Sequence, residues 1–261
     1  MLAGPVPFSP TPYMIFFLEQ IGHYSHFALR SLLVSVSAFR RPADLLAQVY
    51  NILVGALPLA LVTGLALGIV VWIHMRGVLE SYLLPRLPEY LALAVVVEFA
   101  PLGAGLIVAG RTGASLGAEL GSMKLTEQIE ALEVLGQSPM KMLVAPRVMA
   151  AMLSLPFLTI FIAFFSIGSS CLAEMIGGTL SFTQYRIYAM KSLTLTRILP
   201  ATFKTVFFGF LVAVTGCYQG MTVTGGTEGV GKAATRSVVA SIFLVMLSNV
   251  VLVKIIQMVF G

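Results

Sequence analysis

Long runs of apolar residues limit what this chain can fold into more than any other feature. The clearest run covers residues 52–73 and contains no charged side chain. A helix of about 20 apolar residues is long enough to cross the hydrocarbon core of a membrane, where only internally hydrogen-bonded backbone is stable. Four further runs, each with at most one charged residue, lie at 90–110, 148–173, 198–218 and 238–259. We therefore predict an all-α integral membrane protein with five transmembrane helices.

The composition agrees with this fold class. Hydrophobic residues make up 58% of the 261 residues and charged residues only 10%, whereas about a quarter of the residues in a soluble domain are charged. The net charge of +5 does not indicate nucleic-acid binding, because basic residues beside transmembrane helices usually reflect topology. The apolar core that a cleaved signal peptide needs is interrupted by Pro5, Pro7, Pro10 and Pro12. We expect a multi-pass protein of the bacterial inner membrane.

Residues 13–39 form a helical segment with a polar side. Polar residues recur there at intervals of three or four: Glu19, His23, His26 and Arg30. A helix with this pattern lies in the membrane interface instead of crossing it. The two histidines have no third ligand nearby in the sequence, so we interpret them as polar-face residues and predict no metal site.

The longest interruption of the apolar pattern is Arg111 to Arg147, and it contains a short amphipathic helix at 126–135. At about 100° per residue, one side carries Glu127, Glu130 and Glu133 and the other carries Ile129, Ala131, Leu132 and Leu135. Thr126 is a candidate N-cap, Gly136 suits a left-handed position after the last turn, and Pro139 prevents continuation. We interpret this helix as a docking element between the second and third spans, the simpler alternative being a solvated loop.

The distribution of basic residues predicts the orientation. Nine of the 16 Lys and Arg residues fall on the side of the membrane that holds the N-terminal segment and the 126–135 helix. Cytoplasmic segments carry the excess of Lys and Arg. We therefore expect the 126–135 helix to be cytoplasmic and the connection at 174–197 to lie on the opposite side.

Three charged residues fall inside the predicted spans. Glu98 lies near the middle of the second, where an acid usually faces a bundle interior or a water-filled cavity. Glu98 has two possible roles: it bonds to a neighbouring helix and stabilises the bundle, or it contacts the substrate along a transport path. Lys204 and Lys254, in the fourth and fifth spans, are expected to reach the same water layer by snorkelling. In the first span, Gly64 and Gly68 provide a small face for close helix packing.

No motif in the chain predicts catalysis or nucleotide binding. The segment GTEGVGK at 226–232 matches a phosphate-binding loop in spacing, but Ala233 replaces the hydroxyl residue that holds magnesium, and a membrane span precedes it where a strand is required. We interpret it as a flexible glycine-rich turn before the fifth span. No hydrolase motif is present, and Cys171 and Cys217 lie in apolar runs, so we expect no cofactor and no enzymatic activity in this chain.

The run AGRTGASLGAELGSMKLTEQIEALEVLGQSP, followed by PR, and the segment GVGKAATRSVV at 229–239 resemble the MlaE family, the permease subunit of Mla-type ABC phospholipid transporters. The resemblance covers most of the chain from about Asn51 onward. It implies a homodimer, cytoplasmic ATPase subunits that bind ATP and Mg, a periplasmic ring of MCE-domain proteins, and phospholipid cargo for the maintenance of lipid asymmetry.

The resemblance also implies roles for individual residues. A lipid pathway would include Glu98, Val71, Met75 and Leu79, and coupling to the ATPase would involve Glu119, Lys124, Glu127, Glu130, Glu133 and Arg111. Many relatives carry a basic residue where this chain has Val97, so the sequence does not provide Glu98 with a neighbouring partner.

Two other functions remain open from the sequence. A proton-coupled secondary transporter that uses Glu98 would need inverted repeats and discontinuous helices, which five unequal spans do not suggest. A scaffold without transport would leave Glu98 and the acidic helix without a shared task. A neighbouring gene for an ATPase would favour the ABC permease.

Overall fold

The structure is a computed structural model that describes residues 12–81, 87–178 and 180–260. These residues form helices and connecting turns, with no strand among them. In chain order the elements are α1 (Pro12–Ser35), η1 (Val36–Arg40), α2 (Pro42–Ser81), α3 (Leu87–Ala94), η2 (Val95–Phe99), α4 (Ala100–Val108), η3 (Ala109–Gly113), α5 (Ala114–Leu125), α6 (Gln128–Val134), η4 (Met140–Val144), α7 (Ala145–Gly177), α8 (Phe182–Ser192), α9 (Leu195–Met221) and α10 (Gly226–Phe260). The η1 segment is a 3-10 helix, and η2, η3 and η4 are π-helical turns.

Five helices in the described chain are long and apolar enough to cross a membrane. They are Pro42–Gly77, Pro88–Leu125, Met140–Gly177, Leu195–Met221 and Gly226–Val259. Each contains one of the five predicted runs and extends beyond it, because the helices continue through the polar residues that flank the apolar segments. The predicted all-α membrane fold with five spans is confirmed.

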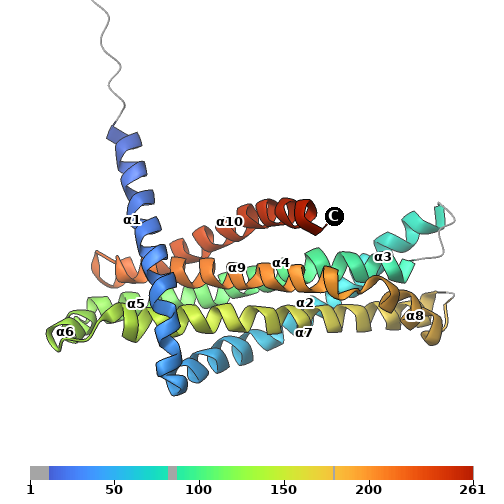
Figure 1. The fold of residues 1–261 in the computed structure, drawn as a ribbon, viewed down its shortest axis with the longest axis horizontal. Coiled ribbons are helices and arrows are strands. Elements are labelled where there is room, and N and C mark those ends of the chain that lie inside the picture. Colours follow the sequence, from blue (N-terminus) through green and yellow to red (C-terminus); the bar gives the residue numbers. More distant parts are fainter. Residues whose placement is uncertain (1–11, 82–86, 179, 261) are drawn as a thin grey trace, which may run out of the picture.

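The helices form an elongated bundle in which α2, the α3–α5 rod, α7 and α9 run lengthwise (Figure 1). The short helix α6 lies at one end of the bundle, and α3 and α8 lie at the other. Helix α1 crosses the bundle near the α6 end, as an interfacial helix is expected to do. Helix α10 packs on α5 and α9 through its first half and then leaves the bundle (Figure 1).

The predicted small face of the first span is confirmed as a helix contact. In α2, Gly64 and Gly68 lie against the backbone of α7 around Ile162 and Ser166. The hydroxyl of Ser166 donates a 2.8 Å hydrogen bond to the carbonyl of Gly64. Glycine lets the two backbones approach closely, which is how helices associate when lipid offers no hydrophobic driving force.

The second span does not end at Gly110 as predicted. It continues as η3 and α5 to Leu125, although this stretch contains several glycines. Gly117 faces Ser237 and Ala233 of α10, with no room for a side chain between them. Close packing against α9 and α10 therefore stabilises a helix that the glycine content alone disfavours.

The segment at 226–232 is also helical, so its prediction as a flexible turn is wrong. The turn lies just before it, where Gly225 and Gly226 have φ angles of 90° and 70°, a region that favours glycine. Residues from Gly226 onward form the first turns of α10, and Lys232 pairs with Glu228 one turn earlier at 2.6 Å. This geometry is not that of a phosphate-binding loop, which follows a strand.

The connection at 174–197 is more ordered than its mixed composition suggests. Glu174 belongs to α7, and the next helix, α8, begins at Phe182. The N-terminus of α8 has a capping box, in which Ser181 accepts a hydrogen bond from the backbone of Gln184 and the Gln184 side chain accepts one from the backbone of Ser181. These two bonds satisfy donors that would otherwise be unpaired at the start of the helix.

Candidate functional site

Glu98 lies in the π-helical turn η2 and pairs with Lys204 of α9. The distance between Glu98 Oε2 and Lys204 Nζ is 2.9 Å. Lys204 follows the start of α9 by nine residues, which is about 14 Å along a helix. The pair therefore links the second and fourth spans well inside the apolar part of the bundle.

The two members of this pair differ in exposure. The Lys204 side chain is 1% exposed, whereas the Glu98 side chain is 38% exposed. The expectation that Lys204 snorkels to water is therefore wrong, because the carboxylate of Glu98 provides a partner inside the bundle. Glu98 keeps an open side, so it remains able to contact a polar group of a substrate.

Lys204 is the residue of the candidate site that the sequence analysis did not assign to Glu98. Position 97, beside Glu98, is a valine, and the partner lies 106 residues further along the chain in α9. The signal was present in the sequence, since a lysine inside an apolar span needs an internal partner unless it reaches the interface.

The other residues predicted for the lipid pathway lie in the second half of α2. Val71 and Met75 are half-buried and pack against the main hydrophobic core. The side chain of Leu79 lies outside the described residues. The assignment of these three residues to a lipid pathway stays a prediction.

A second polar cluster connects α2 to α7 at the α8 end. Trp72 Nε1 donates a 2.6 Å hydrogen bond to Glu174 Oε2, and Glu174 is 4% exposed. The guanidinium of Arg76 lies 5.3 Å from the centre of the Trp72 ring and donates to the carbonyl of Gly177. This cluster fixes the end of α2 against α7, and sequence reasoning did not identify it.

At the opposite end of the bundle, two ion pairs hold the segment around α6. Lys124 of α5 contacts Glu130 of α6, and this contact holds the pKa of Glu130 below its ordinary value. Arg147 of α7 donates a 2.6 Å hydrogen bond to Glu119 of α5, and Arg147 is only 5% exposed. The predicted coupling residues Glu119, Lys124 and Glu130 are thus bound within the chain.

The predicted short helix is present as α6, but its start differs from the prediction. Thr126 does not cap it, because the Thr126 hydroxyl donates back to the carbonyl of Ser122 in α5. The N-cap position is Glu127, which has a left-handed φ of 57°. Gly136 has a φ of 72°, which confirms its predicted role after the last turn.

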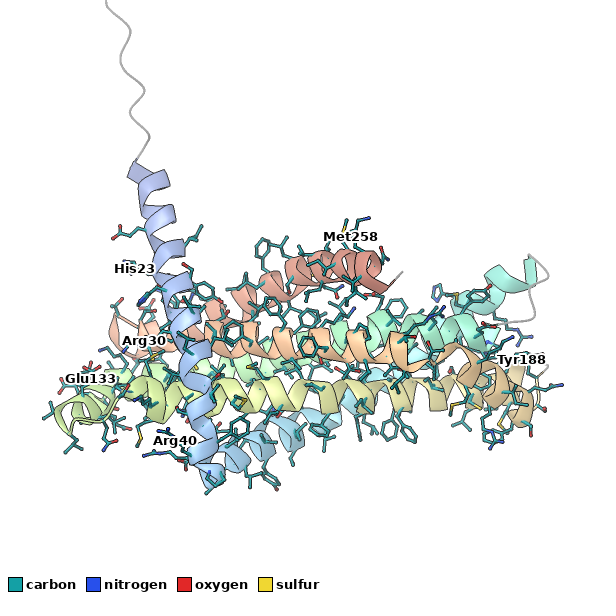
Figure 2. All side chains as sticks on the ribbon, viewed as in Figure 1. His23, Arg30, Arg40, Glu133, Tyr188 and Met258 are labelled. Atoms are coloured by element: carbon teal, nitrogen blue, oxygen red, sulfur yellow. The ribbon has the colours of Figure 1, made fainter. Side chains whose placement is uncertain are left out.

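The outward surface of α6 combines acidic and apolar groups. Glu127 and Glu133 are exposed, and Figure 2 shows Glu133 at the extreme end of the bundle. Ile129 is buried as predicted, but Leu135 is 73% exposed and Val134 is 88% exposed. Leu135 departs from the predicted apolar side because the helix ends at Val134 and the chain turns. A docking role for this exposed tip stays a prediction.

Arg111 lies away from this tip. Its guanidinium packs over Gly55 of α2 and donates a 3.2 Å hydrogen bond to the carbonyl of Asn51. The contact ties the second span to the first, and a part for Arg111 in coupling stays a prediction.

The chain is similar to known permeases over most of its length. The model of the family described as "Permease MlaE" matches residues 45–255. A probable ABC transporter permease of Rickettsia felis is 32% identical over 89% of this chain and 90% of its own length. A probable ABC transporter permease of Rickettsia typhi is 38% identical over 60% of this chain and 61% of its own length.

A third similar protein is the chloroplast protein TRIGALACTOSYLDIACYLGLYCEROL 1 of Arabidopsis thaliana, which is 38% identical over 62% of this chain and 46% of its own length. Several of these matches, including those in Rickettsia typhi and in the chloroplast, span less than two thirds of the relative.

Proposed function

Because the chain belongs to the MlaE permease family, we propose that it is the membrane subunit of an ABC transporter that moves phospholipids between the inner membrane and a periplasmic carrier serving the outer membrane. The observation that carries this proposal is the Glu98–Lys204 pair. It places a half-open carboxylate and a buried ammonium inside the membrane-spanning bundle. Charged groups at this depth mark substrate paths, and a phospholipid headgroup is a substrate that such a pair can contact.

A separate chain supplies ATP hydrolysis in this proposal. Lys232, the only residue resembling a phosphate-binding lysine, lies in helix α10 and pairs with Glu228. The exposed tip of α6, with Glu133 beside Val134 and Leu135, offers a docking surface for a cytoplasmic ATPase. ATP and Mg belong to that partner.

The remaining partners follow from the family and fit the surface of the chain. The second half of α10 exposes apolar residues such as Phe243 and Val250, which suits a homodimer within the membrane. The α8 end faces the periplasm in the predicted orientation and would meet a ring of MCE-domain proteins. The name of the Arabidopsis relative contains that of a lipid, which supports lipid cargo.

The proposal is tested by reconstituting the chain with its partner ATPase and an MCE-domain protein in vesicles that contain a fluorescent phospholipid. We expect ATP-dependent transfer of the fluorescent lipid to the MCE-domain protein. Transfer that proceeds equally without this chain, or that follows an imposed proton gradient instead of ATP, would overturn it. The second outcome would favour a proton-coupled transporter.

Changing the tip of α6 should weaken the binding of the ATPase to this chain. We expect the double variant Glu133→Lys, Leu135→Ser to co-purify with the ATPase about tenfold less, because the charge that orients the partner and the apolar contact are both lost. The matched control is Glu19→Lys, which makes the same charge change on exposed α1. Equal recovery of the ATPase with both variants would place the docking surface elsewhere.

Changing Lys232 to alanine should leave nucleotide binding unaltered. The lysine is 62% exposed and bound to Glu228, so its loss removes a surface ion pair of less than about 1 kcal/mol. Binding of a fluorescent ATP analogue to the whole transporter should match that of the unmodified protein. A reduced affinity would mean that this chain contributes to the nucleotide site.

A further inference from the structure

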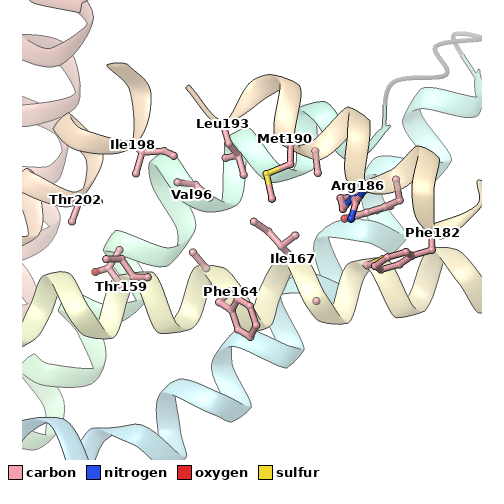
Figure 3. A pocket seen from close by; sticks show the side chains of 16 residues that line it. Val96, Thr159, Phe164, Ile167, Phe182, Arg186, Met190, Leu193, Ile198 and Thr202 are labelled. Atoms are coloured by element: carbon pink, nitrogen blue, oxygen red, sulfur yellow. The ribbon is translucent and has the colours of Figure 1, made fainter. Parts of the chain in front are cut away.

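An elongated pocket of about 460 Å³ lies between α7 and α8, and its inner end adjoins the two segments that carry the Glu98–Lys204 pair. Figure 3 shows α7 along one side and α8 along the other, with Ile198 and Thr202 of α9 and Val96 of η2 at the inner end. The space exists because α8 packs mainly on α3 and has few contacts with α7. Neither Glu98 nor Lys204 lines the pocket.

The length of the pocket matches one leaflet of a bilayer. Its wall on α7 extends from Thr159 to Cys171, which is about 18 Å at the rise of an α-helix. Half of the hydrocarbon core of a membrane is about 15 Å thick. The inner end, at Thr159 and Thr202, therefore lies at the depth that the end of an acyl chain reaches.

The walls of the pocket are almost wholly apolar, and two of their hydroxyl groups, those of Thr159 and Tyr185, are already hydrogen-bonded. Thr159 donates to the carbonyl of Leu155 at 2.9 Å. The Tyr185 hydroxyl is 2.7 Å from that of Ser170, and burial raises the pKa of Tyr185 to about 12. A ligand inside this pocket would therefore be held mainly by apolar contact.

One charged residue, Arg186, lines the pocket at its outer end, near Phe182 (Figure 3). It is exposed and has no acidic partner in the described part of the chain. Arginine binds phosphate through paired, charge-assisted hydrogen bonds. An apolar slot with a single cation at its outer end matches a molecule that has a long hydrocarbon chain and an anionic head.

The pocket is open along its side. Phe164 on the α7 side is 70% exposed and Met190 on the α8 side is 67% exposed. Gly168 of α7 also lines the pocket. A Cβ placed at Gly168 would meet no atom within 4 Å. The slot is therefore open to a chain entering sideways from the membrane.

We propose that this pocket binds one acyl chain of a membrane phospholipid, with the lipid phosphate held by Arg186. The site is additional to the Glu98–Lys204 pair and does not depend on the transport function. In the predicted orientation its lipid belongs to the periplasmic leaflet. Charge complementarity at Arg186 and the leaflet-length slot favour a lipid over a second copy of the chain as the occupant.

The test uses the full chain in nanodiscs that contain phosphatidylglycerol with a photoactivatable diazirine at the end of one acyl chain. After illumination, we expect labelled peptides from the inner end of the pocket, around Thr159 and Thr202. A diacylglycerol with the same chain and no phosphate should label these peptides about tenfold less, because it forms no charge-assisted bond with Arg186.

Two substitutions at α7 provide a matched comparison. In Gly168→Phe, the new Cβ meets no atom within 4 Å, and the ring fills the slot. The change also removes a glycine from a helix interior. The variant should therefore fold and should lose labelling at Thr159 and Thr202. Leu172→Phe adds the same ring one turn along α7, at a residue that is 60% exposed and outside the pocket, and should label normally. Arg186→Gln should lower labelling by phosphatidylglycerol to the level of diacylglycerol.

The proposal is overturned if Gly168→Phe and Leu172→Phe are labelled equally at the inner end. It is also overturned if illumination of chains carrying a photoreactive residue at Met190 yields mainly chain-to-chain products, which would mean that a second copy covers the pocket. Lipid transfer by the Gly168→Phe variant is measured separately, so loss of this site and loss of transport are distinguishable.

Discussion

Replacing Glu98 with leucine is expected to destabilise the protein more than replacing Lys204 with methionine. Without Glu98, the ammonium of Lys204 is left buried with 1% of its side chain exposed, and an unpaired buried charge costs about 3–5 kcal/mol. Without Lys204, the carboxylate of Glu98 remains 38% exposed and can be hydrated. Thermal unfolding of the purified chain in detergent should therefore show the larger loss for Glu98→Leu.

The double variant Glu98→Leu, Lys204→Met separates stability from transport. It removes both charges, and apolar residues of similar size often replace a buried ion pair without loss of stability. We expect its unfolding temperature to recover towards that of the unmodified protein while lipid transfer stays absent. Normal lipid transfer by the double variant would show that the pair only holds the helices together.

The second large effect is expected from Gly68→Ala. A Cβ at this position would overlap the carbonyl oxygen of Ser166 and the hydroxyl of Ser169. Because the obstructing group is backbone, α2 and α7 would have to move apart along their contact. We expect a loss of about 3 kcal/mol or more, seen as a lower unfolding temperature and reduced yield from the membrane.

The control for this prediction is Gly110→Ala. A Cβ at Gly110 meets nothing within 4 Å, and alanine is favoured over glycine in a helix by about 1 kcal/mol. This variant should be as stable as the unmodified protein or more so. If both variants unfold at the same temperature, close approach at Gly68 does not determine stability.

Local pattern was sufficient to predict the fold class and the five spans, since each span is a continuous apolar run. It also identified the Gly64–Gly68 face and the left-handed Gly136. Helix boundaries were less predictable. Residues 111–125 and 226–232 look irregular because of their glycines, yet both stretches are helical. In the first stretch, Gly113 and Gly117 permit close contacts with α10 that only the three-dimensional arrangement reveals.

Partners distant in sequence were the least predictable part of the candidate site. Glu98 was recognised as a charge inside a span, but no sequence pattern connects it to Lys204. The same holds for Trp72 and Glu174, and for Arg147 and Glu119, which come from different helices. Leu135 was assigned to the buried side because helical periodicity was extended one residue past the point where α6 ends.

The Glu98–Lys204 pair has a consequence for how the chain is made. Synthesis proceeds at about 5–20 residues per second, and the two residues are 106 positions apart. Glu98 is therefore synthesised roughly 5 to 20 s before Lys204. Because α9 is the least hydropathic of the five candidate spans, its insertion is expected to depend on the carboxylate already placed in the membrane by the second span.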